Sequence, residues 1–126
     1  MTPRRIIELE KESLEEVRAH EGRGTILFKR ILDGRDLEGA WHFVDYAVLP
    51  PGTGIGRHTH GEDEELYLVL EGEGEMELDG ETFPVRRGSV ILNRRGGTHA
   101  LRNVSDAPLE IFVVEVGLKE EEKNSG

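Results

Sequence analysis

The sequence predicts an all-β fold, a sandwich or a barrel, and two observations on the 126-residue chain support this class. Short apolar runs follow one another from residue 25 onward, separated by Gly, Pro, Asn or Asp, as is typical of strands joined by tight turns. Asp79-Gly80 lies between two such runs and is a strong signal for a two-residue β-hairpin. A chain of this length fits a single domain with an adequate core.

The expected elements follow in order along the chain. Residues 1–24 form an N-terminal segment in which Ser13-Leu14-Glu15-Glu16 matches a capping box, which predicts a short helix running toward Ala19 and ending at Gly22. We expect this segment to pack on the barrel or on a partner. Nine strands are expected at residues 25–32, 43–49, 56–60, 65–70, 74–78, 81–86, 89–92, 99–103 and 109–116. Residues 25–117 thus form the barrel, and the acidic tail 118–126 is expected to be disordered because it has nothing to bury.

The charge of the chain disfavours two classes of partner. The formal net charge is −10 and the pI is near 5.0, whereas nucleic acids and anionic membranes attract clusters of Lys and Arg. The chain has no cysteine, which excludes disulfides. Its first residues carry too many charges for a signal peptide or a membrane span. We therefore expect a cytoplasmic protein that contacts neither nucleic acid nor membrane.

Three histidines and one glutamate form the most informative pattern of the sequence. His58 and His60 are two residues apart, so in a strand they project from the same face. Glu65 opens the next apolar run after the loop 61–64, so a hairpin brings it back beside them, and His99 supplies a third imidazole. Imidazole and carboxylate together suit Mn, Fe, Co, Ni, Cu or Zn, and no thiolate selects a softer ion. The sequence therefore predicts a site for one divalent transition metal ion per chain.

The same residues lie in two motifs that resemble those of the cupin superfamily. The first motif is Gly52, five residues, His58-Thr59-His60, four residues, Glu65, six residues and Gly72. The second motif is Gly88, five residues, Arg94-Arg95-Gly96, two residues, His99, three residues and Asn103. Arg94 stands where the family usually has proline, and Gly96-Gly97 can still supply the bend before His99. The resemblance implies a cupin-type jelly-roll β-barrel of the small single-domain kind, assigns the metal ligands to His58, His60, Glu65 and His99, and favours Mn or Fe.

The other polar residues outside this pattern have plainer interpretations. His20, at the expected helix end, is interpreted as interacting with the helix dipole, and His42 as a surface or core residue. Arg94, Arg95 and Arg102 are interpreted as solvated loop residues, with an anionic substrate at the mouth of the barrel as the alternative.

Period-two alternation predicts which side chains face inward. If Glu65 points inward, so do Tyr67 and Val69, while Leu66, Leu68 and Leu70 point outward. An outer row of leucines needs a cover, either the N-terminal segment or a second copy of the chain, and we expect a homodimer. Tyr67 is the candidate catalytic residue, with a packed aromatic as the alternative. The remaining cavity wall is expected from Met76, Leu78, Val85, Leu101 and one face of residues 43–49.

Two classes of function fit these observations. Four protein ligands on an ion that prefers six leave positions open, as in catalytic metal sites. The first class is a metal-dependent enzyme (dioxygenase, isomerase or epimerase, or decarboxylase) acting on a small oxygenated, anionic molecule. The alternative is a non-catalytic module that binds or senses a small molecule, a sugar or an acid, with the metal as an anchor. The complete ligand set and the open positions favour the enzyme over the binding module.

Overall fold

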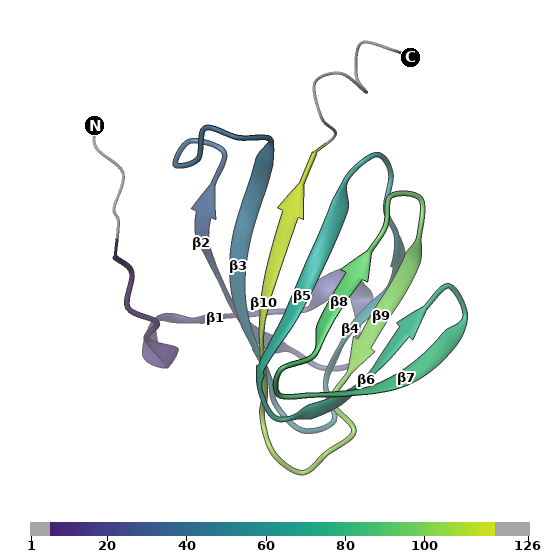
Figure 1. Ribbon diagram of the computed structural model, residues 1–126. Coiled ribbons are helices and arrows are strands. Elements are labelled where there is room, and N and C mark those ends of the chain that lie inside the picture. Colours follow the sequence, from purple (N-terminus) through teal and green to yellow (C-terminus); the bar gives the residue numbers. More distant parts are fainter. Residues whose placement is uncertain (1–5, 118–126) are drawn as a thin grey trace.

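Two antiparallel β-sheets make up the computed structural model, which describes residues 6–117 (Figure 1). The first sheet has six strands in the spatial order β1, β2, β3, β10, β5 and β8. Their bounds are Glu15–Val17 (β1), Ile26–Asp33 (β2), Trp41–Leu49 (β3), Leu109–Val116 (β10), Glu64–Glu71 (β5) and Val90–Asn93 (β8). The second sheet has four strands in the order β4 (Gly54–Thr59), β9 (Thr98–Arg102), β6 (Glu73–Leu78) and β7 (Glu81–Arg86). The all-β class is as predicted, and the nine expected strands correspond to β2–β10.

The hydrophobic core joins the inner faces of both sheets. Leu49, Tyr67 and Ile111 of the six-stranded sheet belong to one buried cluster with Met76 and Leu101 of the four-stranded sheet. In β5 the predicted alternation is confirmed, because Tyr67 and Val69 are 2% and 1% exposed while Leu66 is 38% exposed. The expected hairpin at Asp79-Gly80 is also formed: Leu78 pairs with Glu81, and both turn residues have positive φ. Burial on one face of each sheet thus fixes the register of the strands around the site.

The short N-terminal helix expected from the capping box is not formed. Two 3₁₀ turns, η1 (Lys11–Ser13) and η2 (Ala19–Glu21), flank strand β1 instead. The Ser13 hydroxyl donates to the Glu10 carbonyl oxygen at 2.9 Å, and Glu15–Val17 pairs with β2. Pairing with the edge of the sheet satisfies the backbone of residues 15–17, so tertiary structure overrides the local helix signal.

After β1 the chain crosses directly over the start of β4. Gly22 and Gly56 make this approach possible, because a Cβ on Gly56 would overlap the His20 carbonyl oxygen and one on Gly22 would overlap that of Gly54. His20 and Glu21 have φ angles of 51° and 57°, in the left-handed region that L residues rarely adopt. This tight crossing holds His20 above β4.

The N-terminal segment does not cover the outer face of β5. Ile7, Leu9 and Leu14 instead line a surface hollow with Ile31 and Tyr46, on the outer side of β2 and β3. The apolar side chains that remain exposed on β5 and on the neighbouring edge strand β8 are Leu66, Val90 and Leu92. No helix within residues 6–117 is long and apolar enough to cross a membrane. The tail 118–126 predicted to be disordered lies outside the described residues.

Candidate metal centre

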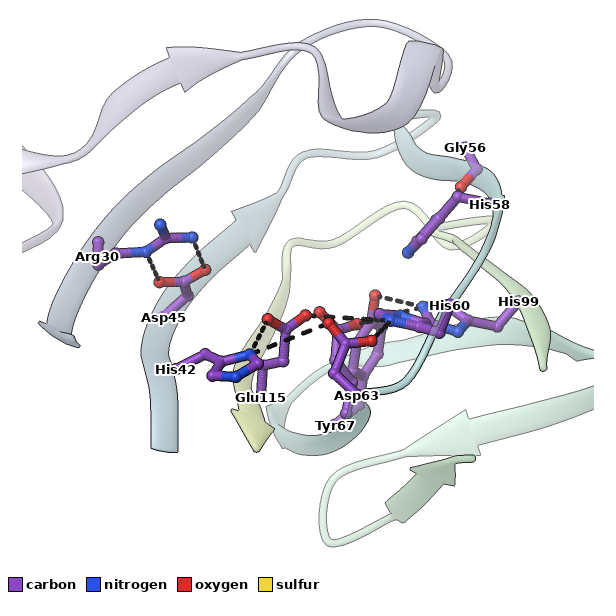
Figure 2. A network of polar contacts seen from close by, with 11 residues as sticks. Arg30, His42, Asp45, Gly56, His58, His60, Asp63, Tyr67, His99 and Glu115 are labelled. Atoms are coloured by element: carbon purple, nitrogen blue, oxygen red, sulfur yellow. Dashed lines mark hydrogen bonds and ion pairs between the residues drawn. The ribbon is translucent and has the colours of Figure 1, made fainter. Parts of the chain in front are cut away.

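The structure brings the four predicted ligand residues together at one end of the barrel interior. His58 lies on β4 and pairs directly with His99 on β9, His60 follows the end of β4, and Glu65 lies on β5. Each residue offers one ligand atom, and these four atoms all lie within 4.8 Å of one another. Residues more than thirty positions apart in sequence therefore meet at a single point (Figure 2).

Local backbone structure sets the direction of the first two rings. β4 has one extra residue relative to β9 between Ile55 and His58, a β-bulge of the kind that redirects side chains. The carbonyl of Gly56 in this bulge accepts a hydrogen bond from His58 Nδ1 at 2.9 Å. The backbone of His60 is anchored to the turn at Arg94-Gly97, since its N–H donates to the Gly97 carbonyl and its own carbonyl accepts from Gly96 N–H. Gly96 takes the left-handed conformation (φ 74°), so the turn forms without the usual proline.

The ring nitrogens that face the common point suit a metal ion. Because His58 Nδ1 donates to a carbonyl, its Nε2 carries the lone pair, and this buried atom has no hydrogen-bond partner among residues 6–117. His60 Nε2 and His99 Nε2 lie 3.0 Å and 3.3 Å from Glu65 Oε1. Three imidazoles and a carboxylate are a usual donor set for a divalent transition ion, and an unsatisfied buried acceptor is costly unless something occupies its lone pair. The residues present therefore fit such an ion.

Electrostatics act differently on the individual ligand residues: they favour a neutral His58 ring and an ionised Glu65, but a protonated His60 ring when no ion is bound. Burial lowers the pKa of His58 to about 4, so its ring stays neutral. Burial also lowers the pKa of His60, but the hydrogen bond to Asp63 and the charge of Glu65 outweigh this and raise it. Burial raises the pKa of Glu65, but the hydrogen bond from His99 and the nearby His60 bring it below its usual value. Glu65 is therefore an ionised acceptor in the centre of the cluster.

A second set of polar residues adjoins the cluster and was not predicted as functional. Asp63 Oδ1 accepts a hydrogen bond from His60 Nδ1 at 2.9 Å, so in the neutral ring, the form that binds a metal, His60 Nε2 is the nitrogen with the lone pair. Glu115 lies on β10 directly opposite Glu65 and is 2.8 Å from His42 Nδ1. His42 is the extra residue of a bulge in β3 opposite the end of β10, and the bulge aims its ring at Glu115. Burial, with the charges of Asp63 and Glu65, raises the pKa of Glu115 to about 7 despite the hydrogen bond to His42.

His20 lies beside the cluster rather than at a helix end. Its ring stacks on that of His58, with centroids 3.5 Å apart and planes 8° from parallel. The interpretation as a residue at a helix dipole is wrong, because no α-helix forms there. The sequence could not place His20 next to His58, because their contact depends on residues 19–22 crossing over β4.

Asn93 is a further residue that the sequence analysis missed. It is 2% exposed and pairs in register with Glu65 on the neighbouring strand, so both side chains lie on the inner face. Neither atom of its amide has a hydrogen-bond partner within the described part of the chain. The expected strand ended at residue 92, one position before it. A buried amide without a partner beside Glu65 is a second group that a bound molecule could satisfy.

A cavity of about 270 Å³ adjoins Glu65 and Tyr67. Its apolar wall comes from the N-terminal crossing and from strands of both sheets, and includes Val17, Ile26, Phe28, Phe43, Ile55 and Val113. The prediction that residues 43–49 supply one wall is correct, since Phe43, Asp45 and Ala47 line the cavity. Met76, Leu78, Val85 and Leu101 were also expected in the wall, but they do not line the cavity and instead pack in or against the core.

The three arginines considered for the mouth of the barrel do not line this cavity. Arg94 and Arg95 are exposed in their turn, as the interpretation as solvated loop residues requires. Arg102 pairs with Glu75 at 2.8 Å. Among residues 6–117, Arg30 is the one basic side chain, lysine or arginine, that lines the cavity, and the sequence did not predict it there.

Tyr67, the candidate catalytic residue, is fully buried, and its hydroxyl lies 3.2 Å from His99 Nε2. Burial, with the nearby carboxylates of Glu65 and Asp45, raises the pKa of Tyr67 well above its usual value. The hydroxyl therefore keeps its proton and is available as a hydrogen-bond donor at the edge of the cluster.

Comparison with known proteins places these observations in a family. The family described as "Cupin domain" matches residues 45–115, more than half of the chain. An oxalate-binding protein of Thermotoga maritima is 28% identical over 93 residues, which cover 74% of this chain and 77% of that protein. An uncharacterised protein of Methanocaldococcus jannaschii is 29% identical over 102 residues, covering 81% of this chain and 82% of that protein. The crystal structure of a predicted oxalate decarboxylase from Thermotoga maritima superposes with a TM-score of 0.83 at 24% identity, covering 89% of this chain and 100% of that one.

Proposed function

The chain belongs to the cupin domain family, and we propose that it binds a divalent transition metal ion through His58, His60, Glu65 and His99 and holds a small oxygenated anion beside that ion. The geometry of the ligand atoms carries this proposal. The four ligand atoms lie within 4.8 Å of one another, and the lone pair of the buried His58 Nε2 has no hydrogen-bond partner among the described residues.

An anion is the ligand class that the charges favour. When bound, a divalent ion supplies a Lewis acid with open positions for ligand oxygens. Glu65 contributes one negative charge, which leaves a divalent centre net positive. The curated relative named as an oxalate-binding protein is consistent with a small carboxylate as ligand. The family resemblance favours Mn or Fe, and Co, Ni, Cu and Zn are compatible with the same donor set.

We propose that the protein is a metal-dependent enzyme of the dioxygenase, isomerase or epimerase, or decarboxylase class, with Tyr67 as its catalytic residue. The Tyr67 hydroxyl lies 3.2 Å from His99 Nε2 at the edge of the cluster and keeps its proton. It can donate a hydrogen bond to a ligand oxygen, or a proton to a group that becomes basic during the reaction.

The second candidate function is binding or sensing without turnover. It is favoured by the composition of the cavity wall, which is largely apolar apart from His20, Arg30, Asp45, Glu65 and Tyr67. Replacing Tyr67 by Phe separates the two: an enzyme loses turnover while ligand affinity changes little, and a binding module shows no turnover before or after the change.

We propose a homodimer that covers the exposed Leu66, Val90 and Leu92. These side chains project from β5 and from β8, which ends the six-stranded sheet. Leu92→Glu should shift the protein from dimer to monomer in light scattering, whereas Glu81→Gln, an exposed change in the other sheet, should not.

The experiment that tests the metal proposal is equilibrium dialysis against Mn²⁺ or Co²⁺ with wild type, His58→Ala and His99→Ala. His42→Ala is the control, because it removes an imidazole next to the cluster but outside the proposed ligand set. We expect about one ion per chain in the wild type and in the control, and a marked loss in the two ligand variants. Unchanged metal content in His58→Ala and His99→Ala would refute the assignment. Oxalate that binds the metal-loaded protein but not the chelated protein would support the anion site.

A further inference from the structure

The cavity has an ion pair set apart from the histidines (Figure 2). Arg30 on β2 and Asp45 on β3 are directly paired across the two strands and face the cavity. Arg30 Nε donates to Asp45 Oδ1 at 2.9 Å and Nη2 donates to Oδ2 at 3.1 Å. This fork is the geometry in which arginine recognises a carboxylate most strongly.

Neighbouring aromatic rings hold the guanidinium in place. Its central carbon lies 4.1 Å from the centroid of the Phe43 ring and 5.8 Å from that of Phe28. Stacking on Phe43 and the two bonds to Asp45 together restrict the rotamers of a long side chain. Little further entropy is lost when such a preorganised group binds a ligand.

The ion pair leaves the guanidinium with spare donors. A guanidinium has five N–H groups, and Asp45 accepts from two of its nitrogens, Nε and Nη2. The Arg30 side chain is 48% exposed, whereas that of Asp45 is 7% exposed. Asp45 is thus neutralised by Arg30, and the N–H groups of Nη1 are not used in its two hydrogen bonds to Asp45.

A purely structural ion pair explains only part of this arrangement. The buried Asp45 needs a cation, which Arg30 supplies. A structural role does not require that the pair line the same cavity as Glu65 and Tyr67. Nor does it require that about half of the arginine side chain stay exposed. The cavity volume of about 270 Å³ also exceeds the needs of a two-carbon diacid and approaches the lower end of small-molecule sites, about 300 Å³.

We propose that Arg30 determines ligand specificity, and that the ligand is a carboxylic acid with a planar or apolar body that spans the cavity. One oxygen-bearing end binds at the metal centre, and a carboxylate at the other end accepts hydrogen bonds from the outer edge of Arg30. This inference rests on the proposed function, because the first end needs the bound metal ion. To the proposed function it adds Arg30 as a second point that holds the ligand. It also specifies the part of the ligand that lies between the metal centre and Arg30 as planar or apolar.

The test uses a chelating probe with and without the second anion. Benzohydroxamic acid has a metal-binding end and a planar body, and its meta and para derivatives can carry either a carboxylate or a carboxamide of similar size. Titration calorimetry with Co²⁺-loaded protein gives the dissociation constant of each probe. The proteins are wild type, the double variant Arg30→Gln/Asp45→Asn, which removes the pair without leaving a buried charge, and the single variants Arg30→Lys and Arg35→Gln. Arg35 also pairs with an aspartate, Asp33, but its side chain is 91% exposed, and it does not line the cavity.

We expect the wild type and Arg35→Gln to bind at least one carboxylate isomer about ten-fold more tightly than the matching carboxamide. The double variant should lose this preference while its affinity for benzohydroxamic acid is unchanged, and Arg30→Lys should show a reduced preference because it lacks the planar fork. No carboxylate preference in the wild type for either isomer, or a preference that survives in the double variant, overturns the role of Arg30. If benzohydroxamic acid itself fails to bind the metal-loaded wild type, the open metal site is refuted, and this inference falls with it.

Discussion

The histidine cluster, which meets the cavity at Glu65, and the Arg30–Asp45 pair in the cavity wall differ in how far their groups are satisfied within the chain. At the histidine cluster, His58 Nε2 and the Asn93 amide are buried without hydrogen-bond partners among the described residues. At the Arg30–Asp45 pair, both carboxylate oxygens accept hydrogen bonds and the arginine is half exposed. Unsatisfied buried groups cost stability unless a ligand occupies them, whereas a satisfied pair with spare donors can bind or release an anion at little cost. The histidine cluster therefore has more to gain from a bound ion, and Arg30 has more scope for selecting the molecule beside it.

The largest expected effect is on metal affinity after loss of the residue that orients His60. Asp63→Asn replaces the acceptor of the His60 Nδ1 hydrogen bond by an amide, which holds the ring less firmly and makes Nε2 a weaker ligand. We expect metal affinity to fall about 10–100-fold, measured by competition with a fluorescent chelator. Glu62→Gln, an exposed neighbour that loses the same charge, is the control. Equal affinities in wild type and Asp63→Asn would show that the hydrogen bond plays no part in the site.

The contrast between satisfied and unsatisfied groups can be tested with two buried asparagines. Asn93 is without partners, whereas Asn103 donates to the Leu49 and Ala107 carbonyls and accepts from Ser105 N–H. In the metal-free protein, Asn103→Leu should lower the free energy of unfolding by about 1–3 kcal/mol for each buried group left without a partner. Asn93→Leu should leave it unchanged or raise it by about 1 kcal/mol, because no bond is lost.

Urea denaturation of both variants measures this difference. A loss of stability in Asn93→Leu as large as that in Asn103→Leu would mean that Asn93 is satisfied in the folded protein. Asn93→Leu should also weaken ligand binding at the metal centre. Unchanged ligand affinity would mean that the Asn93 amide does not contact the ligand.

A further comparison concerns the pH dependence of the metal-free protein. Burial lowers the pKa of His58 from 6.5 in the unfolded chain to about 4. Between pH 6.5 and 4 the unfolded state therefore takes up a proton that the folded state does not, so the contribution of His58 makes the free energy of unfolding fall as pH falls through this window. His58→Phe should reduce that dependence, measured by urea denaturation in steps from pH 7 to 4. The same slope in both proteins would argue against a neutral, buried His58.

Much of the fold could be predicted because its signals are local. Asp79-Gly80 specifies its own turn, and alternation in residues 65–70 separates the inward Tyr67 and Val69 from the outward Leu66. The juxtaposition of His58, His60 and Glu65 follows from the same two rules, a two-residue spacing and a hairpin. His99 could be added to the predicted ligand set because the second motif places it on a strand of the same barrel.

The features that were missed depend on contacts between distant residues. The crossing of His20 over β4 requires glycine at positions 22 and 56, and nothing local distinguishes this from an ordinary turn. In β2, Phe28 and Arg30 alternate with Lys29 and Ile31, so each face carries one apolar and one basic residue, and parity alone cannot say which faces inward. A local capping signal at Ser13 was overridden for the related reason that β1 pairs with β2.

The most direct test of the metal centre is a crystal structure of the protein grown with Co²⁺ or Mn²⁺, with diffraction data collected at the absorption edge of that metal. We predict one anomalous peak bounded by His58 Nε2, His60 Nε2, His99 Nε2 and the Glu65 carboxylate. The absence of a peak there, or a peak only among His42, Asp63 and Glu115, whose ligand atoms also lie within 4.8 Å of one another, would contradict the proposed centre.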